Sequence, residues 1–99
     1  MIGDKGRMIK VKIGVILTLK EILGGHNHEI ELQENSTLKG LLKELSDRYG
    51  ENFRKQLFDP KTGEVKFYRI ALNDRQCTDV EAPLNDGDKI NFYPALAGG

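Results

Sequence analysis

The stretch LNDGDKINFYPALAGG (residues 84–99) contains a turn, a strand and a tail in succession. Its D-G-D triplet at 86–88 is typical of a turn, because glycine readily adopts positive φ. Apolar residues then alternate from Lys89 to Tyr93, which predicts a strand with one buried face. Pro94 has no N–H to donate to a neighbouring strand, so we expect pairing to stop near it.

The residues after this strand are the first candidate site. Residues 95–99 carry no charged side chain and cannot pack a helix or a core layer, so we expect an extended tail. Without a Cβ, Gly98 and Gly99 could enter a narrow channel while Leu96 anchors the tail in an apolar groove. A carboxylate is a poor electrophile, so the Gly99 carboxylate would need a leaving group before it could react. Adenylation by ATP provides one. The plainer alternative is a frayed terminus or a cloning remnant.

Patterns of period two predict the other strands. Apolar residues alternate with lysines from Met8 to Ile13, and the apolar run that continues to Leu19 suggests that this strand lengthens or bends after Gly14. Further strands are expected over residues 28–33 and 67–72, with a short, weak one over 75–80.

One amphipathic helix is expected between the second and third strands. Apolar residues recur there at helical spacing, at Leu38, Leu41, Leu42, Leu45 and Tyr49. Asn35-Ser36-Thr37 offers N-cap side chains, and Gly50 stands where helices often end. Residues 51–58 could add a short helix.

The order of elements indicates a two-layer sandwich of helix on sheet. A right-handed helical crossover between two hairpin-like pairs would place the first and last strands side by side and parallel. This predicts an α+β protein with a β-grasp fold, in which a mixed sheet of four to five strands packs on one main helix. We expect a flexible leader at residues 1–7, the domain at 8–94 and the tail at 95–99.

Composition excludes several classes of function. The 99 residues carry 15 Lys+Arg and 15 Asp+Glu, so the electrostatic signature of nucleic-acid or anionic-membrane binding is missing. No apolar run approaches the ~20 residues of a spanning helix. One cysteine, Cys77, excludes an intrachain disulfide, a thiolate zinc cage and a cysteine-held iron–sulfur cluster, and it fits a reducing compartment. We therefore expect a cytoplasmic protein that binds neither nucleic acid nor membrane.

Three other candidate sites have plainer interpretations. His26 and His28 could hold a metal, but only two strong ligands are visible, which favours a solvent-exposed loop. Cys77 has no base fixed beside it by a motif and is interpreted as an inert or partly buried thiol. The 86–88 triplet lacks the rest of a calcium loop. We therefore predict no metal or cofactor bound by this chain, and no catalytic activity of its own.

Together these features resemble the ubiquitin-like sulfur carriers, in particular the small subunit of molybdopterin synthase and the archaeal ubiquitin-like modifiers. The resemblance runs from Met8 to Gly99. It is carried by residues 8–12, 20–24, 36–38 and 70–73, and most specifically by the run Leu84-x-Asp86-Gly87-Asp88-x-Ile90-x-Phe92-Tyr93-Pro94-Ala95-x-Ala97-Gly98-Gly99.

The resemblance implies a carrier rather than a catalyst. An adenylyltransferase related to the ubiquitin-activating enzymes would use ATP to adenylate the Gly99 carboxylate, and a persulfide sulfur would displace AMP to leave a thiocarboxylate. The large subunit of molybdopterin synthase would then receive the tail, and the sulfur would pass to a cyclic pterin precursor. The partner-binding residues that this implies are Tyr93, Pro94, Ala95, Leu96, Ala97 and Gly98.

The chain departs from the family pattern in three places: at Gly14, where an aromatic residue is frequent, at Gln76-Cys77, which replaces an apolar contact, and in a longer loop over 59–66. Other functions therefore stay open beside the molybdopterin role. The sulfur could go to a different acceptor, or Gly99 could be conjugated to lysines of target proteins. In a third alternative the chain is a non-covalent interaction module whose tail is incidental.

Overall fold

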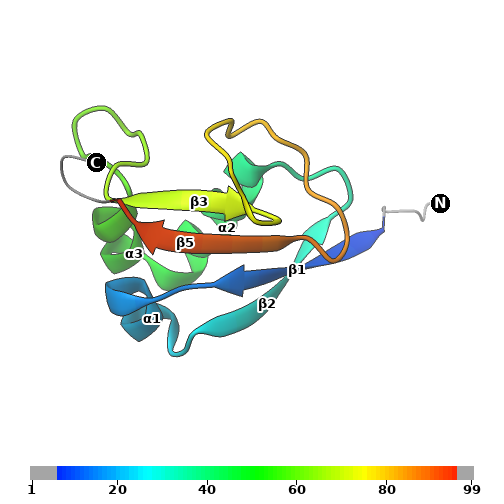
Figure 1. The fold of residues 1–99 in the computed structure, drawn as a ribbon, viewed down its shortest axis with the longest axis horizontal. Coiled ribbons are helices and arrows are strands. Elements are labelled where there is room, and N and C mark those ends of the chain that lie inside the picture. Colours follow the sequence, from blue (N-terminus) through cyan, green and yellow to red (C-terminus); the bar gives the residue numbers. More distant parts are fainter. Residues whose placement is uncertain (1–6, 96–99) are drawn as a thin grey trace.

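A computed structural model describes residues 7–95, as five strands and three helices (Figure 1). In chain order the elements are β1 (Met8–Gly14), α1 (Leu17–Leu23), β2 (Asn27–Gln33), α2 (Leu38–Tyr49), α3 (Glu51–Leu57), β3 (Tyr68–Leu72), β4 (Arg75–Gln76) and β5 (Lys89–Pro94). The leader residues 1–6 and the tail residues Leu96, Ala97, Gly98 and Gly99 lie outside the described residues.

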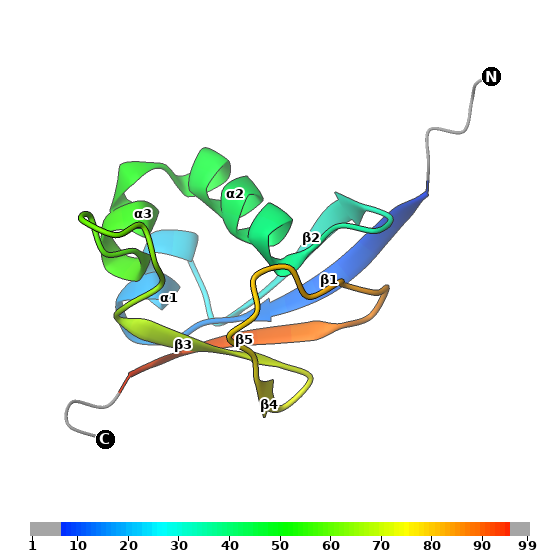
Figure 2. The ribbon, with the colours of Figure 1, turned by 90° about the horizontal axis from the view of Figure 1, so that it is seen from above.

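The strands form one mixed sheet in the order β2-β1-β5-β3-β4. At its centre β1 and β5 run parallel, with Ile13 opposite Ile90, and the flanking pairs are antiparallel. All three helices cover the same face of the sheet (Figure 2). The predicted β-grasp fold is therefore confirmed, including the parallel pairing of the first and last strands.

The main helix, α2, begins and ends where the sequence predicts. The Thr37 hydroxyl oxygen accepts a hydrogen bond from the Gly40 N–H at 3.3 Å, as an N-cap side chain does. Gly50 ends the helix with a φ of 77°, a conformation that favours glycine. The predicted leucine stripe faces the sheet, and all four of its leucines are buried: Leu38, Leu41, Leu42 and Leu45.

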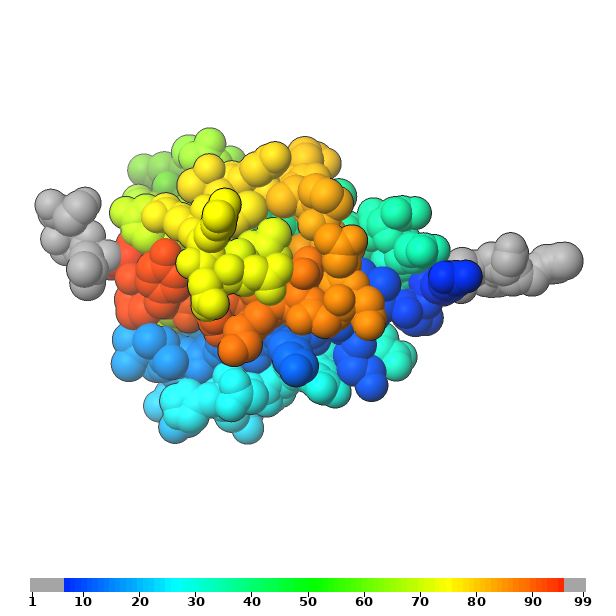
Figure 3. All heavy atoms as spheres, turned by 45° about the vertical axis from the view of Figure 1, so that its right-hand side comes forward, coloured from blue at the N-terminus to red at the C-terminus, as the bar shows by residue number. Residues whose placement is uncertain are grey.

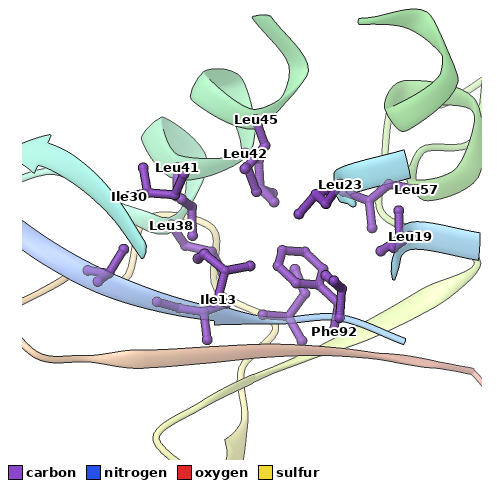
Figure 4. Packing of buried hydrophobic residues seen from close by; sticks show 14 of the residues in the cluster. Ile13, Leu19, Leu23, Ile30, Leu38, Leu41, Leu42, Leu45, Leu57 and Phe92 are labelled. Carbon is purple, nitrogen blue, oxygen red and sulfur yellow. The ribbon is translucent and has the colours of Figure 1, made fainter. Parts of the chain in front are cut away.

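The core lies between the helices and the sheet (Figure 4). Alternate residues of β1 point into it, so that Ile9, Val11 and Ile13 are buried while the lysines between them are exposed. Phe53 of α3 meets Phe92 of β5 edge to face, with ring centroids 6.5 Å apart. Helix α3 thus contributes to the core, and the short helix predicted over 51–58 is confirmed as Glu51–Leu57.

The predicted continuation of the first strand is wrong. β1 ends at Gly14, and the apolar run enters helix α1, whose Leu19 and Leu23 are buried. The entry has no capping side chain, and Leu17 adopts a positive φ of 56°. Burial of two leucines on one helical face outweighs the missing cap, because tertiary packing supplies most of a short helix's stability.

The predicted strand over 75–80 is also shorter than expected. Only Arg75 and Gln76 form β4. The chain then turns towards α2, where the Val80 and Ala82 carbonyls accept the N–H groups of Lys39 and Leu38 at 2.7 and 2.9 Å. These are N–H groups that a helix cannot satisfy internally, so the segment completes the start of α2 instead of extending the sheet.

Candidate functional site: the end of β5

The described part of the predicted tail site is the end of β5. Strand β5 continues to Pro94, which lies opposite Tyr68. Beyond it the Ala95 N–H donates to the Phe67 carbonyl at 3.1 Å. Pairing with β3 thus extends one residue past Pro94, to the last described residue, and the predicted stop lies outside the described part of the chain. The last residues of β5 reach the surface between α1 and the start of β3 (Figure 3).

Exposed apolar side chains gather around this end of the sheet. Ile16 follows β1 directly and is 40% exposed, and Leu17 at the start of α1 is 59% exposed. Phe67, which bonds to Ala95, is 47% exposed. Tyr93, Pro94 and Ala95 are half-buried. The partner-binding role of the β5 residues stays a prediction. Ile16, Leu17 and Phe67 are not singled out by the sequence, since only the fold brings these separate segments to one edge.

The other end of β5 is a hydrogen-bonded turn. Asp86 accepts the Lys10 N–H through Oδ1 at 2.8 Å. Asp88 accepts the Asn73 side-chain amide through Oδ1 at 2.8 Å and the Asn85 N–H through Oδ2 at 2.7 Å. Both carboxylates therefore tie β5 to neighbouring segments, which confirms the turn interpretation. Within residues 7–95, no three potential ligands cluster as a metal site would need.

The two histidines are also engaged by the backbone. His26 Nδ1 lies 3.1 Å from the Val15 carbonyl, and His28 Nε2 lies 3.0 Å from the Gly25 carbonyl. Both rings thus brace the turn between α1 and β2. Cys77 is half-buried, and its N–H donates to the Ile70 carbonyl at 2.8 Å, so it extends the pairing of β3 by one residue.

Gly14 is explained by its neighbour on β5. A Cβ at this position would collide with the side-chain oxygen of Asn91, which lies opposite Gly14 in the central pair. The glycine that stands here in place of the family's frequent aromatic residue is therefore paired with a polar residue, Asn91, on the adjacent strand.

Two ionisable groups, the half-buried Asp59 and the exposed Lys43, have shifted pKa values. The Lys61 N–H donates to Asp59 at 2.8 Å and, together with the Lys66 ammonium at 3.4 Å, lowers the pKa of that carboxyl. A hydrogen bond to Asp47 raises the pKa of Lys43. Both pairs are local: the first organises the loop between α3 and β3, and the second lies on the surface of α2.

Comparison with known families identifies the chain. A family model described as the ThiS family matches residues 13–99. The chain belongs to the ThiS family. Members of this family are small carriers without catalytic activity, so the chain is a ubiquitin-like sulfur carrier or protein modifier. The match includes both the described end of β5 and the four residues beyond it.

Solved structures place this ThiS-family chain among similar proteins. The HVO 2177 protein of Haloferax volcanii is 26% identical, with a TM-score of 0.79 over 100% of this chain and 93% of that one. Subunit 1 of the molybdopterin-converting factor of Helicobacter pylori, solved in complex with subunit 2, is also 26% identical, with a TM-score of 0.59 over 92% of this chain and 100% of that one. SAMP1 of Haloferax volcanii shares the fold at 16% identity, with a TM-score of 0.75 over 91% and 99% of the two chains.

No curated protein matched this ThiS-family sequence. Among the described residues, no helix has the length and apolar character needed to cross a membrane.

Proposed function

We propose that this chain carries sulfur as a thiocarboxylate on Gly99 and delivers it in molybdopterin synthesis. The observation that carries the proposal is the match to the ThiS family, which continues through Gly99. The geometry supports it, because β5 leads the chain to the half-buried residues Pro94 and Ala95 at one edge of the molecule, directly before the last four residues. The partner proteins contribute the catalytic groups, and the chain contributes the acyl group.

The proposed chemistry begins with the Gly99 carboxylate attacking ATP on an activating adenylyltransferase. An acyl adenylate forms and pyrophosphate leaves. A persulfide on the partner then displaces AMP, which gives an acyl disulfide. A second partner thiol breaks the sulfur–sulfur bond and is oxidised to a disulfide, while the thiocarboxylate is released. ATP is thus used by the partner, and this chain needs no bound cofactor of its own.

The proposed partner surface is the end of β5 with the side chains around it. Tyr93, Pro94 and Ala95 lie at the base of the tail, and Leu96, Ala97 and Gly98 continue towards Gly99. The exposed apolar residues Ile16, Leu17 and Phe67 would be covered when a partner receives the tail. The molybdopterin assignment rests on the Helicobacter pylori relative, whose complex with subunit 2 suggests an equivalent large subunit as the partner here.

Intact mass spectrometry tests the sulfur chemistry. The full chain is incubated with its activating enzyme, ATP and a persulfide donor, and we expect one oxygen to be exchanged for sulfur in the peptide that contains Gly99. Deletion of Gly98 and Gly99 should abolish the exchange and leave thermal unfolding unchanged. Glu34→Ala, at the distant end of β2, is the matched control and should react like the parent chain. An unchanged mass with an enzyme active on another carrier would contradict the proposal.

The destination of the sulfur is tested separately. The thiocarboxylated chain should form a complex with a molybdopterin synthase large subunit and convert the cyclic pterin precursor in that complex. If sulfur is acquired but the pterin is not converted, the molybdopterin assignment is wrong and the carrier serves another acceptor. Higher-mass conjugates in cells that disappear on deletion of Gly98 and Gly99 would instead identify a protein modifier. If tail deletion leaves cellular function intact, the chain is a non-covalent interaction module.

A further inference from the structure

Leu17 is held in a backbone conformation that leucine disfavours. Its φ of 56° lies in the left-handed region, where the Cβ of an L-residue crowds the backbone. The fold fixes the chain on both sides of it. The Val15 N–H donates to the His26 carbonyl at 2.9 Å, and the Val15 carbonyl lies 3.1 Å from His26 Nδ1. Two residues after Leu17, Leu19 is fully buried. A strained residue persists where its surroundings determine the backbone in this way.

The side chain of Leu17 does not compensate for this strain within the domain. It is 59% exposed, the largest exposed fraction among the large apolar side chains of residues 7–95. A glycine would relieve the backbone, and a polar residue would leave less apolar surface in water. Neither the backbone nor the core therefore favours leucine here, which points to a contact outside the domain.

Leu17 belongs to an apolar patch around the end of β5, which it forms with Ile16 and Phe67. The Phe67 carbonyl accepts the Ala95 N–H at 3.1 Å, so this side of the patch is joined to the base of the tail. On the other side, Leu17 is the first residue of α1. Figure 3 shows the last part of β5 at the surface between these two segments. The patch therefore flanks the strand that leads to Gly99.

Only a short length of chain separates this patch from the proposed acyl group. Gly99 lies four residues beyond Ala95, and four residues span at most about 14 Å even when fully extended. That length is little more than the width of one helix with its side chains. A protein whose active site reacts with Gly99 must therefore closely approach the patch. Sulfur transfer and conjugation to lysine both begin with adenylation, so the activating enzyme is the occupant common to both.

We propose that Leu17 is an anchor residue for the activating adenylyltransferase, and that its side chain enters an apolar pocket of that enzyme beside the channel for the tail. The fixed backbone holds the side chain outwards before binding, so little conformational freedom is lost on association. Leu17 thus contributes to binding of the carrier and not to transfer of the adenylyl group. This inference rests on the proposed function, because it requires that Gly99 is adenylated.

Exchange of labelled pyrophosphate into ATP tests the anchor. The full chain is titrated against its activating enzyme, and kcat and the KM for the chain are measured separately. Leu17→Ala should raise this KM by about tenfold at the same kcat, which is the effect of losing most of one buried leucine side chain. Leu17→Met keeps an apolar side chain and should restore most of the affinity. Met8→Ala is the matched control, because Met8 is 55% exposed at the start of β1, and it should keep the parent KM.

A further variant tests the strain. Leu17→Gly removes the same side chain and also relieves the left-handed backbone. Its midpoint of thermal unfolding should therefore lie about 4–8 °C above that of Leu17→Ala, and the two variants should share the raised KM. A midpoint at or below that of Leu17→Ala would overturn the role of the strained backbone.

Failure of the anchor and failure of the proposed function give different results. If the parent chain is adenylated and Leu17→Ala keeps the parent KM, or loses kcat at unchanged KM, the anchor is wrong and the proposed function stands. If Leu17→Met loses as much affinity as Leu17→Ala, the enzyme has no apolar pocket for this residue. If the parent chain is not adenylated by an enzyme active on another carrier, the proposed function is wrong and the anchor with it.

Discussion

The two ends of β5 are built in opposite ways. At its start, Asp86 and Asp88 accept three hydrogen bonds from separate parts of the chain, and further backbone bonds join Lys12 to Asp88 and Gly87 to Lys10. At its finish, the described residues show one backbone bond past the strand, from the Ala95 N–H to the Phe67 carbonyl, among exposed apolar side chains. Asp86 and Asp88, which could suggest a cation site, therefore have a structural role. We place the proposed function at the opposite, apolar end of β5.

We expect the largest effect from a substitution in the hydrophobic core, because both ends of β5 depend on the folded domain. Leu41 is fully buried on the sheet-facing side of α2, so Leu41→Asp would place an unpaired carboxylate in the core. The cost should consume most of the ~5–15 kcal/mol by which such domains are stable. Circular dichroism should show no cooperative unfolding. Lys39→Asp introduces the same side chain at an exposed position of α2 and should retain it; cooperative unfolding of Leu41→Asp would contradict the packing.

The next largest effect on the free energy of unfolding should differ between the two ends of β5. Asp88→Ala leaves the Asn73 amide and the Asn85 N–H without their acceptor, and we expect a loss of about 1–3 kcal/mol in the free energy of unfolding. Ala95→Pro removes only the last bond of the opposite end and should cost about 0.5–1.5 kcal/mol. Urea denaturation measures both. A larger loss for Ala95→Pro would reverse the comparison.

A smaller effect is expected between the ends, at the centre of the sheet. Gly14→Ala forces the Asn91 side chain aside, and we expect a loss of about 1 kcal/mol from the crowding. Asn91→Ala in the same chain removes the colliding oxygen and should restore part of that stability. The double-mutant cycle therefore measures the coupling. Additive losses would show that Gly14 is not required by Asn91.

The smallest effect concerns the loop beside the end of β5. Because the folded-state pKa of Asp59 is lowered, its carboxylate contributes stability above the ordinary aspartate pKa of about 3.9, and this is lost as pH falls through the folded-state value. The free energy of unfolding of Asp59→Asn should therefore differ from that of the parent chain at neutral pH, and the difference should vanish in strong acid. A difference independent of pH would exclude the Lys61 and Lys66 contacts as its cause.

Sequence patterns predicted most of the fold because its main signals are local. The leucine stripe of α2, its Thr37 cap and the alternation in β1 each follow from a period and a cap within one segment. The helix α1 was missed because its apolar run carries no capping residue and begins at Leu17 with positive φ. Only the packing of Leu19 and Leu23 against distant residues decides it.

The site residues stay a prediction, and the sequence suggests only some of the residues at the end of β5. Tyr93, Pro94 and Ala95 are suggested because the end of the chain resembles the family's tail, and the strand pattern places them at the end of β5. The surrounding residues Ile16 and Phe67 could not be predicted, because nothing local marks them and they meet only through strand order.

The parallel pairing of β1 with β5 has a consequence for how the protein folds as it is synthesised. Strand β1 is among the first parts of the domain to leave the ribosome and β5 is the last, yet they must lie side by side before the sheet is whole. Pairing such distant segments costs the entropy of closing a long loop, which slows folding. A nascent or truncated chain that lacks β5 therefore cannot complete the centre of its sheet.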